Sequence, residues 1–286
     1  MSALEIIATG PLTTVQDTGR FGHADLGVGR SGAADAASYA LANRLLANPE
    51  GAAALEATLG GLRVRARGAV TVAVTGAEAP LSVDGRGAAA NTVLHLPDGA
   101  ELTMGMPSRG LRTYLAVRGG VDVPPVLGSR STDVLAGLGP EAPVPGAVLP
   151  VGPAPSGFPR VDHAAVAPVG GPEATLRVDL GPREDWFTDD AIATLLSGEY
   201  EVTSRSDRVG ARLSGPVLER APSRSGELPS EGMVVGSLQV PPGGEPVLFL
   251  ADHPVTGGYP VVAVVRTADL PKAAQARPGS RIRFAM

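Results

Sequence analysis

The sequence contains no cysteine, and its only lysine is Lys272. The absence of cysteine excludes disulfides, thiolate nucleophiles and thiolate metal ligands. Lys272 lies between Pro271 and Ala273, so the chain has neither the glycine–lysine pair of a phosphate-binding P-loop nor a Met-Lys-Met site for attaching biotin. We therefore predict that no cofactor is bound covalently by this chain, and that any ATP or biotin that its function uses is carried by another chain.

Basic charge and long apolar runs are also scarce. The 24 lysine and arginine residues are outnumbered by 29 aspartate and glutamate residues, which gives a formal net charge of −5. Such a chain has no broad basic surface for nucleic acid or anionic lipid. No apolar run approaches the roughly 18 residues of a membrane span, and residues 1–5 lack the basic flank and apolar run of a signal peptide. The sequence predicts a cytoplasmic protein without nucleic-acid or membrane partners.

Short apolar runs separated by turns dominate the sequence. Examples are 69–75, 113–118 and 261–265, and the turns draw on 38 glycines and 27 prolines. Many short strands with frequent turn residues are typical of a barrel or sandwich, so we predict an all-β fold, mainly β with a few short helices. Asp35 and Thr188 can each cap a helix. The helices are expected over residues 35–46, over 189–196 and near 271.

A proline- and glycine-rich segment interrupts this pattern at residues 151–172. It lacks apolar periodicity and is typical of a linker. We therefore predict a first barrel domain over 1–150 and a second over 173–286. The Asp, Arg and Gly of Asp17–Gly22 recur in Asp207–Gly210, which supports an internal duplication only faintly because four-residue similarities arise by chance.

Two kinds of catalytic motif fit poorly. Gly27–Gly32 matches G-x-G-x-x-G before a helix, but no buried strand is expected before it, so a dinucleotide site is disfavoured. Its glycines either present backbone N–H groups to an anion or carbonyl oxygen, or form only a turn. The chain has no G-x-S-x-G motif, and its four histidines have no metal-ligand spacing. A stand-alone serine hydrolase and a zinc enzyme are both disfavoured, and we predict no metal site.

A series of motifs, in order along most of the chain, resembles one known family. The motifs are Gly10–Arg20, Ser31–Asp35, Ala42 and Asn43, Leu55–Thr58, Thr75–Ala77, Tyr114–Gly120, Val126–Thr132, Ser206–Leu213, Ser230–Gly232, Gln239–Pro242, Thr256–Pro260 and Ala268–Leu270. Together they are similar to the bacterial 5-oxoprolinase C-type subunits, a family also called allophanate-hydrolase subunit 2 or biotin-dependent carboxyltransferase (KipA). Ala34 stands where that family usually has methionine.

The resemblance implies two cyclophilin-like β-barrel domains in tandem. It also implies a hetero-complex in which this chain joins a homologous B-type subunit and an A-type subunit, and which uses ATP to hydrolyse 5-oxo-L-proline to L-glutamate. Two alternatives stay open. One is a carboxyltransferase subunit that moves a carboxyl group from carboxybiotin, with the biotin on another chain, to urea or a similar amide. The other is a non-enzymatic regulator of a kinase-inhibitor protein.

A small planar amide needs donors toward its oxygen and an acceptor for its N–H group. Within the matched motifs, Arg130 is predicted to receive a carbonyl or carboxylate oxygen, with Ser129 and Thr132 beside it. Asp35 and Asn43 are predicted to hold the amide side, unless Asp35 only caps its helix. The predicted catalytic residues are Asp35, Asn43 and Arg130. The predicted substrate-binding residues are Gln16, Asp17, Arg20, Ser31, Gly32, Ser129, Thr132, Asp207, Arg208, Glu231, Gln239, Thr256, Gly257, Gly258 and Tyr259.

Overall fold

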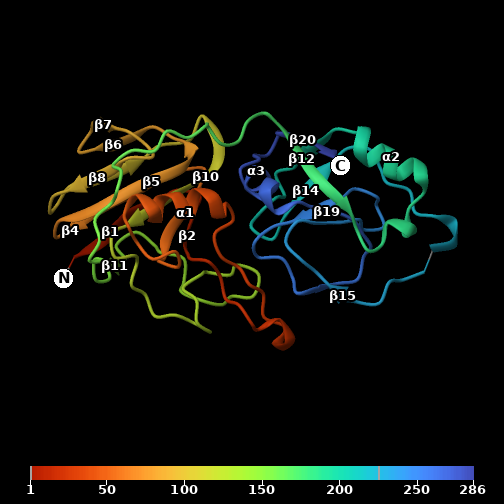
Figure 1. Cartoon of the computed structure of the whole chain (residues 1–286), viewed down its shortest axis with the longest axis horizontal. Helices are drawn as coiled ribbons and strands as arrows, with labels where there is room; N and C mark the ends of the chain where they lie inside the picture. Colours follow the sequence, from red (N-terminus) through yellow and green to blue (C-terminus); the bar gives the residue numbers. More distant parts are fainter. Residues whose placement is uncertain (1, 225) are drawn as a thin grey trace. The chain divides into compact units, whose positions relative to one another are not determined.

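The computed structural model describes residues 2–224 and 226–286 of the chain. Strands dominate it and the helices are few and short, so the mainly β prediction is confirmed (Figure 1). The chain forms two compact units. The first consists of the residues up to Arg20, Ser31–Asp133 and Gly137–Val169; the second consists of Phe21–Arg30, Val134–Ala136 and Gly170–Met286. Within the described residues, no helix is long and apolar enough to cross a membrane.

The first unit is built from two antiparallel sheets. One has the strand order β11-β1-β4-β9-β6-β7 and the other β2-β3-β10-β5-β8. The strands of the first sheet are β1 (Ala3–Thr9), β4 (Leu62–Arg67), β6 (Leu81–Val83), β7 (Arg86–Ala88), β9 (Glu101–Met104) and β11 (Val148–Pro150). Those of the second are β2 (Leu12–Gln16), β3 (Ala54–Thr58), β5 (Val70–Glu78), β8 (Val93–Leu96) and β10 (Arg109–Val117). Apolar side chains from both sheets form one shared core.

The strand β4 illustrates how the sequence sets the two faces of a strand. Leu62, Val64 and Ala66 are buried in the core, and the three arginines that alternate with them are not. This is the period of two that a half-buried antiparallel strand requires. The arginines form ion pairs with Glu5 of β1 and Glu101 of β9, so the outer face of this sheet is held by charge across neighbouring strands.

A helix covers the other face of the second sheet. α1 (Ala36–Leu45) begins after its cap Asp35 and ends before Leu46, close to the predicted bounds. Its buried Tyr39 and Ala42 pack in one cluster with alanines of β3, β5 and β10. Because those strand side chains are small, the helix lies close to the sheet, where it packs on β5 and β10.

Most of the segment predicted as a linker, 151–172, is bonded to the first unit. Arg118, directly after β10, donates hydrogen bonds to the backbone oxygens of Pro155 and Gly157. Residues 162–164 run beside the edge strand β8 and the residues before it: Val93 N donates to Asp162 O at 2.8 Å, and Ala164 N donates to Asn91 O at 2.9 Å. Only the last three residues of the predicted linker belong to the second unit.

The second unit is a closed barrel with the strand order β12-β19-β16-β17-β14-β13-β20. β12 pairs antiparallel with β19 and parallel with β20. The barrel strands are β12 (Glu173–Leu180), β13 (Tyr200–Val202), β14 (Gly210–Ser214), β16 (Ser237–Gln239), β17 (Val247–Phe249), β19 (Val261–Val265) and β20 (Arg281–Ala285). A separate two-stranded sheet joins β15 (Glu231–Gly232) to β18 (Thr256–Gly257). Leu176, Leu238, Leu248, Val262 and Phe284 are among the buried residues of the barrel core.

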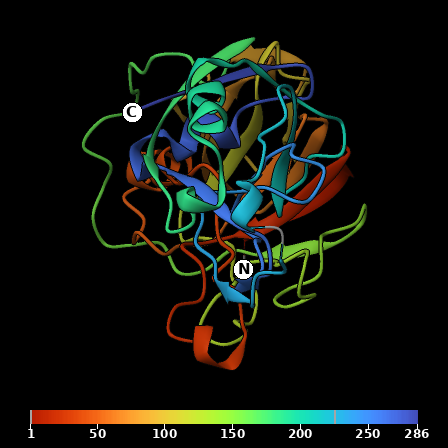
Figure 2. The ribbon, with the colours of Figure 1, turned by 90° about the vertical axis from the view of Figure 1, so that its right-hand side faces the viewer.

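Two short helices accompany the barrel. α2 (Asp189–Ser197), the teal-green helix in Figure 2, packs against β20. The Thr188 side chain accepts a hydrogen bond from Ala191 N and caps this helix, as predicted. α3 (Leu270–Ala274) matches the helix predicted near Pro271. The remaining helical turns are the 3-10 helices η1 (Ala24–Leu26), η2 (Glu184–Trp186), η3 (Pro222–Arg224) and η4 (Thr267–Asp269).

Asp269 joins α3 to β12. Its buried carboxylate accepts hydrogen bonds from Arg177 N at 2.9 Å and Arg177 Nε at 2.8 Å, and Lys272 Nζ lies 2.7 Å from it. The side-chain hydrogen bonds of Arg177, with smaller effects from Lys272, hold the pKa of Asp269 well below its usual value despite the opposing effect of burial. A carboxyl group with a depressed pKa contributes stability above its unfolded pKa and loses that contribution as the pH falls.

We expect Asp269→Asn to lower the free energy of unfolding of the second unit by about 1.5–3 kcal/mol at neutral pH, the range for hydrogen bonds to a charged group. The difference from the unchanged chain should shrink as the pH falls below about 3.9, the unfolded pKa of aspartate. Urea unfolding followed by Trp186 fluorescence measures it, because the single tryptophan of the chain lies in the core of this unit.

Asp179→Asn is the matched control for this experiment. Asp179 pairs with Arg266 on the surface, so its replacement should change the free energy of unfolding by less than about 0.5 kcal/mol. A loss for Asp269→Asn that is the same at neutral and at acidic pH would contradict the assigned role of the charge.

Candidate functional site

The carboxylate of Asp17 is the centre of a polar cluster in the first unit. Its Oδ1 accepts hydrogen bonds from Ser129 Oγ at 2.7 Å, Ser131 Oγ at 2.5 Å and Gly19 N at 2.8 Å. Its Oδ2 accepts a hydrogen bond from Arg130 N at 2.6 Å. Asp17 is 6% exposed, so these four donors replace water around a buried charge. They join the segment after β2 to residues 129–132, more than a hundred positions away in the sequence.

Ser31 and Gly32 belong to the same cluster. Ala33 N donates to Asp17 O at 2.9 Å, which places the turn that contains Ser31 and Gly32 against the segment that contains Asp17. Gly32 has a φ of 97°, and a Cβ atom there would lie 3.0 Å from Gly19 N. The glycine therefore permits a close approach of two backbone segments, in a conformation that other residues rarely adopt. Ser31 Oγ lies 3.3 Å from Thr132 O, to which it donates.

Arg20 carries the main unsatisfied polar group of this cluster. Its side chain is 2% exposed, and Nη2 donates to Ser131 O at 2.5 Å. Its Nε and Nη1 atoms have no hydrogen-bond partner among the described residues. A guanidinium is always charged in proteins, and burying its donors without partners is costly. Two donor atoms of a buried cation therefore lack an acceptor among the described residues, and an oxygen of a ligand or of ordered water would satisfy them.

Gln16 supplies a free acceptor in the same segment. Its buried Nε2 donates to Thr14 Oγ1 at 3.0 Å and to Thr132 O at 2.9 Å, which fixes the orientation of the amide. The Oε1 atom has no hydrogen-bond partner in the described part of the chain. Arg20 thus donates to the carbonyl oxygen of Ser131, and Gln16 donates to that of the adjacent Thr132. One offers donors for an oxygen and the other an acceptor for an N–H group.

The Arg130 side chain lies outside the Asp17 cluster, so the structure does not bring its guanidinium together with the other predicted residues of the first unit. Its Nε donates to Val123 O at 2.6 Å, its Nη2 donates to Asp122 Oδ1 at 2.9 Å, and the side chain is 33% exposed. Only its backbone N–H group reaches Asp17. Of these two arginines, Arg20 is the one with buried donor atoms that have no hydrogen-bond partner among the described residues. The two arginines stand in equally polar motifs, and nothing local in the sequence distinguishes the buried one.

Asp35 and Asn43, the other two predicted catalytic residues, form hydrogen bonds within α1 and the turn after it. Asp35 accepts hydrogen bonds from Ser38 N at 3.0 Å and Ser38 Oγ at 2.6 Å, the arrangement of a helix cap. Asn43 donates to Ala52 O and accepts from Asn48 Nδ2, each at 2.9 Å. Both side chains therefore hold α1 and the turn after it, and the helix-cap alternative for Asp35 is supported.

Glu56 is a buried charged residue to which the sequence analysis gave no role. It accepts hydrogen bonds from Tyr114 Oη at 2.8 Å and Ala34 N at 3.0 Å, and Arg112 Nε lies 3.5 Å away. Burial, followed by the charge of Glu56, raises the pKa of Tyr114 well above its usual value. The Tyr114 oxygen in turn accepts from Asp35 N at 2.7 Å. This network fixes the start of α1 to β3 and β10, and the family motif around Glu56 was the one sequence signal for it.

In the second unit, most of the predicted residues gather around the small β15–β18 sheet. Glu231 pairs in register with Gly257, and Gln239 Nε2 donates to Tyr259 O at 3.1 Å. A Cβ atom on Gly257 would lie 2.5 Å from Gln239 Nε2, so this glycine permits the close packing. The hydrogen bonds of Arg183 to Glu231 lower the pKa of that carboxyl group. The predicted residues that join this group are Glu231, Gln239, Thr256, Gly257, Gly258 and Tyr259.

Asp207 and Arg208 lie elsewhere in the second unit and have separate roles. Arg208 is 1% exposed and forms two hydrogen bonds of 2.9 Å with Asp252, a residue that the sequence analysis missed. Asp207 is exposed, and its Oδ1 accepts from Val209 N and Gly210 N in a local turn. Arg208 is thus neutralised by a buried carboxylate, whereas no ion pair is formed by Arg20 among the described residues.

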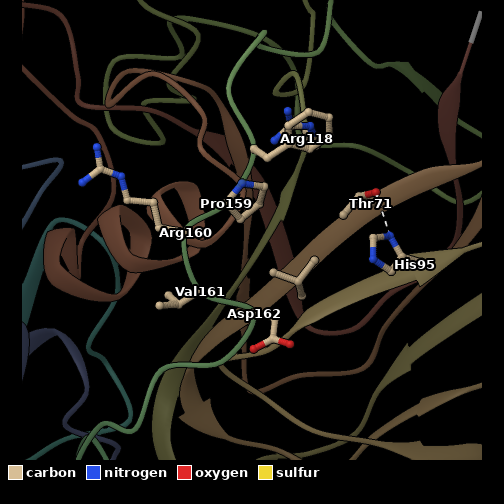
Figure 3. A pocket seen from close by; sticks show the side chains of 9 residues that line it. Thr71, His95, Arg118, Pro159, Arg160, Val161 and Asp162 are labelled. Atoms are coloured by element: carbon tan, nitrogen blue, oxygen red, sulfur yellow. Dashed lines mark hydrogen bonds between the residues drawn. The ribbon is translucent and has the colours of Figure 1, made fainter.

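A cavity of 540 Å³ lies beside β8 in the first unit (Figure 3). Thr71 Oγ1 and His95 Nδ1 are 3.1 Å apart at one side of it. The Arg118 guanidinium is bonded to backbone oxygens, and Figure 3 shows Arg160 reaching away from the Thr71–His95 pair. In most ligand sites a few polar groups converge on one point. The polar groups around this cavity do not. Across residues 2–224 and 226–286, no group of three or more histidine or acidic side chains is placed to hold a metal ion.

A comparison with known protein families shows to which family this chain belongs. Residues 26–286 match the family model for the carboxyltransferase domain, subdomain A and B. The chain belongs to this carboxyltransferase-domain family. The match confirms the resemblance on which the predicted site residues were based.

Named relatives of this carboxyltransferase-domain chain fall into two groups. It is 36% identical to the C-type subunit of 5-oxoprolinase from Escherichia coli (strain K12), over 98% of this chain and 90% of that protein. It is 35% identical to urea amidolyase of Lachancea kluyveri, over 99% of this chain but only 17% of that protein. The relatives are thus an enzyme subunit of similar length and a much longer enzyme.

Solved structures share the fold of this carboxyltransferase-domain chain. The crystal structure of TTHA0988 aligns with a TM-score of 0.90 at 36% identity and covers all of this chain. The urea amidolyase of Kluyveromyces lactis aligns with a TM-score of 0.91 at 32% identity over 99% of this chain. This chain spans 56% of the TTHA0988 chain and 18% of the urea amidolyase.

We expect Asp17→Asn to loosen the polar cluster of the first unit. The substitution replaces a carboxylate oxygen by an NH₂ group that faces donors, so it should cost about 1.5–3 kcal/mol in local stability. Hydrogen exchange followed by mass spectrometry should show faster exchange at Gly19 and Arg130, whose N–H groups donate to Asp17.

Asp84→Asn is the control for the Asp17 substitution. Asp84 accepts a hydrogen bond from Glu101 N and has a φ of 48°, which asparagine adopts readily. Exchange at Gly19 and Arg130 should be unaffected by this change. If Asp17→Asn likewise left these two amides fully protected, the Asp17 carboxylate would not be what orders the cluster.

Proposed function

We propose that this chain is the C-type subunit of an ATP-dependent 5-oxoprolinase complex, in which it acts with A-type and B-type partner subunits. The observation that carries the proposal is the similarity to the E. coli subunit, which extends over nearly the full length of both proteins. The urea amidolyases match equally well but contain this region as a small part of a longer chain. The free donors of Arg20 and the free acceptor of Gln16 support it chemically.

The proposed substrate, 5-oxo-L-proline, presents groups complementary to this cluster. Its ring carbonyl and its carboxylate offer oxygens to Arg20 Nε and Nη1, and its ring N–H group offers a donor to Gln16 Oε1. Hydrolysis breaks the ring C–N bond, adds the hydroxyl of water to the carbonyl carbon and leaves the proton on nitrogen, which yields L-glutamate. ATP supplies the activation when bound, and we assign its binding to a partner because this chain has no P-loop.

In this proposal Arg20 and Gln16 bind and orient the substrate. A guanidinium aimed at the carbonyl oxygen stabilises negative charge that develops there, and a buried position strengthens that interaction. The bonds that Asp17 makes to Ser129, Ser131 and Arg130 hold the surrounding segment in place. Positioning of this kind needs neighbours that do not shift, which agrees with the close packing at Gly32.

Carboxyl transfer to urea is the second candidate function. It is favoured by the family model and by the 35% identity to urea amidolyase over 99% of this chain. Urea is also a planar molecule with one carbonyl oxygen and N–H donors, so the same pair of side chains suits it. In this alternative the carboxyl group arrives on biotin that is attached to another chain, because this chain has no lysine in a biotin attachment motif.

The purified chain should release no glutamate from 5-oxo-L-proline and ATP by itself, and should do so when mixed with its A-type and B-type partners. In that mixture, Arg20→Gln should lower kcat/KM about 100-fold or more, the effect of losing one preorganised donor to a developing oxyanion. Arg20→Lys should also be impaired, because an ammonium cannot reproduce the fork of two donors.

Arg130→Gln is the matched control, since Arg130 is bonded to Asp122 and Val123 at a partly exposed position. This variant should keep its kcat/KM within about threefold of the unchanged chain, whereas loss of a transition-state donor lowers the rate about 100-fold or more. Wild-type activity in both Arg20 variants would remove Arg20 from the site while leaving the function intact. An assembled mixture that releases no glutamate would reject the oxoprolinase function, and urea-dependent consumption of carboxybiotin would then establish the second candidate.

A further inference from the structure

A loop over residues 131–140 carries the two carbonyl groups that orient the proposed substrate-binding side chains. Its first two carbonyl oxygens accept hydrogen bonds from Arg20 Nη2 and Gln16 Nε2, respectively. The two ends of the loop are joined, because Thr132 Oγ1 donates to Pro140 O at 2.9 Å. A shift of the loop backbone would therefore displace the acceptors of both side chains together.

The tip of this loop belongs to the second unit. Residues 134–136 are grouped with that unit, whereas the residues on either side belong to the first. A turn closes the tip, because Gly137 N donates to Asp133 O at 3.0 Å and Asp133 N donates to Leu138 O at 2.8 Å. Since the turn is closed by its own backbone, a group that holds the tip also limits movement at the base of the loop, two residues away.

A buried carboxylate of the second unit holds the tip. Asp252 Oδ2 accepts a hydrogen bond from Val134 N at 3.1 Å. The carboxylate itself is fixed by the two hydrogen bonds that Arg208 donates to it. The backbone is fixed as well, since Asp252 N donates to Arg208 O at 3.0 Å. Hydrogen bonds to ionised groups are roughly twice as strong as those between neutral groups, so Asp252 gives the loop a firm attachment.

We propose that Asp252 is a positioning residue for the substrate-binding pair Arg20 and Gln16. Through Val134 N it fixes the tip of the 131–140 loop, and the loop fixes the carbonyl oxygens to which the pair donates. Asp252 thus acts through the loop and not on the substrate itself. Small displacements of orienting groups matter, because a misplacement of about 1 Å can lower a rate about 100-fold. This inference rests on the proposed function, since it concerns the same site.

Val134→Pro tests this role with little other change. Proline has no N–H group, so the substitution removes the bond to Asp252 and keeps the ion pair of Asp252 with Arg208. Position 134 is the first residue inside the turn, where proline is favoured, and Asp133 pairs with Leu138 as an isolated bridge, which suits the residue before a proline. Asp252→Asn would also remove the charge that neutralises buried Arg208, so loss of the fold would obscure its effect. Val134→Ala, which keeps the N–H group, is the matched control.

Hydrogen exchange of the chain by itself measures the positioning without any assumption about function. Val134→Pro should speed exchange about tenfold or more at Thr132 N, which donates to Val15 O at the base of the loop, because one hydrogen bond to a charged group is lost. Val134→Ala should leave this amide protected. The amides of β4 and the fluorescence of Trp186 should show in both variants that the two units remain folded.

Turnover of 5-oxo-L-proline in the mixture with the A-type and B-type partners tests the consequence for the site. Val134→Pro should lower kcat/KM about tenfold, and Val134→Ala should keep it within about threefold. A double-mutant cycle shows whether the loss passes through Arg20. In a chain that already carries Arg20→Gln, Val134→Pro should lower kcat/KM by less than about threefold, because the group that it displaces is gone. A general loosening of the fold would instead lower the rate by the same factor in both backgrounds.

Three results would overturn the role of Asp252. They are unchanged exchange at Thr132 in a folded Val134→Pro chain, unchanged kcat/KM in that variant, and an equal loss with and without Arg20→Gln. Failure of the proposed function gives a different result, because the mixture with the unchanged chain then releases no glutamate. The same variants are in that case compared in urea-dependent consumption of carboxybiotin, where the same losses are expected and unchanged rates reject the proposal.

Discussion

The candidate site depends on one buried carboxylate, that of Asp17. A charge taken out of water is tolerated only when hydrogen bonds replace the lost hydration, and Asp17 has four of them within 2.8 Å. Because the donors come from two segments far apart in sequence, the same bonds fix the position of both. The orientation of Arg20, which bonds to Ser131 O, follows from this arrangement. Gly139 belongs to the same constraint, because a Cβ there would lie 2.9 Å from Arg20 Nη2.

The two units use similar motifs for different ends. In the second unit, Arg208 donates two hydrogen bonds to Asp252, and the pair holds together the loops that carry these two residues. In the first unit, the neighbouring acid Asp17 has its carboxylate occupied by hydroxyl and backbone donors, and Arg20 keeps two donors free of partners among the described residues. Unsatisfied buried polar groups are rare in native proteins and are expected where a ligand completes the bonding. Under the proposed function, this contrast is the reason to assign substrate binding to Arg20 and a structural role to Arg208.

The sequence predicted the features that local interactions determine. The apolar run at 261–265 and the caps at Asp35 and Thr188 depend on neighbouring residues only, and they appear where expected. The features that were missed depend on partners far away in the chain. Nothing local distinguishes Arg20 from Arg130, since their burial is decided by segments that the fold brings together, and the same holds for Glu56 and for Asp252. The docking of residues 151–169 was missed because its bonds are made mainly by its own backbone, which has no sequence signature.

Under the proposed function, the chemistry of the unsatisfied groups supports a division of roles between this chain and partner subunits. Arginine does not lose its proton in proteins, and a glutamine amide does not titrate, so Arg20 and Gln16 bind and polarise but transfer no proton. The hydroxyl protons of Ser129 and Ser131 are already directed at Asp17. Hydrolysis of an amide requires a proton to leave water and another to reach nitrogen, and the bonded cluster offers no free group for either step. Under the proposed function, the first unit of this chain supplies orientation and charge stabilisation, and the proton transfers fall to groups outside the Asp17 cluster.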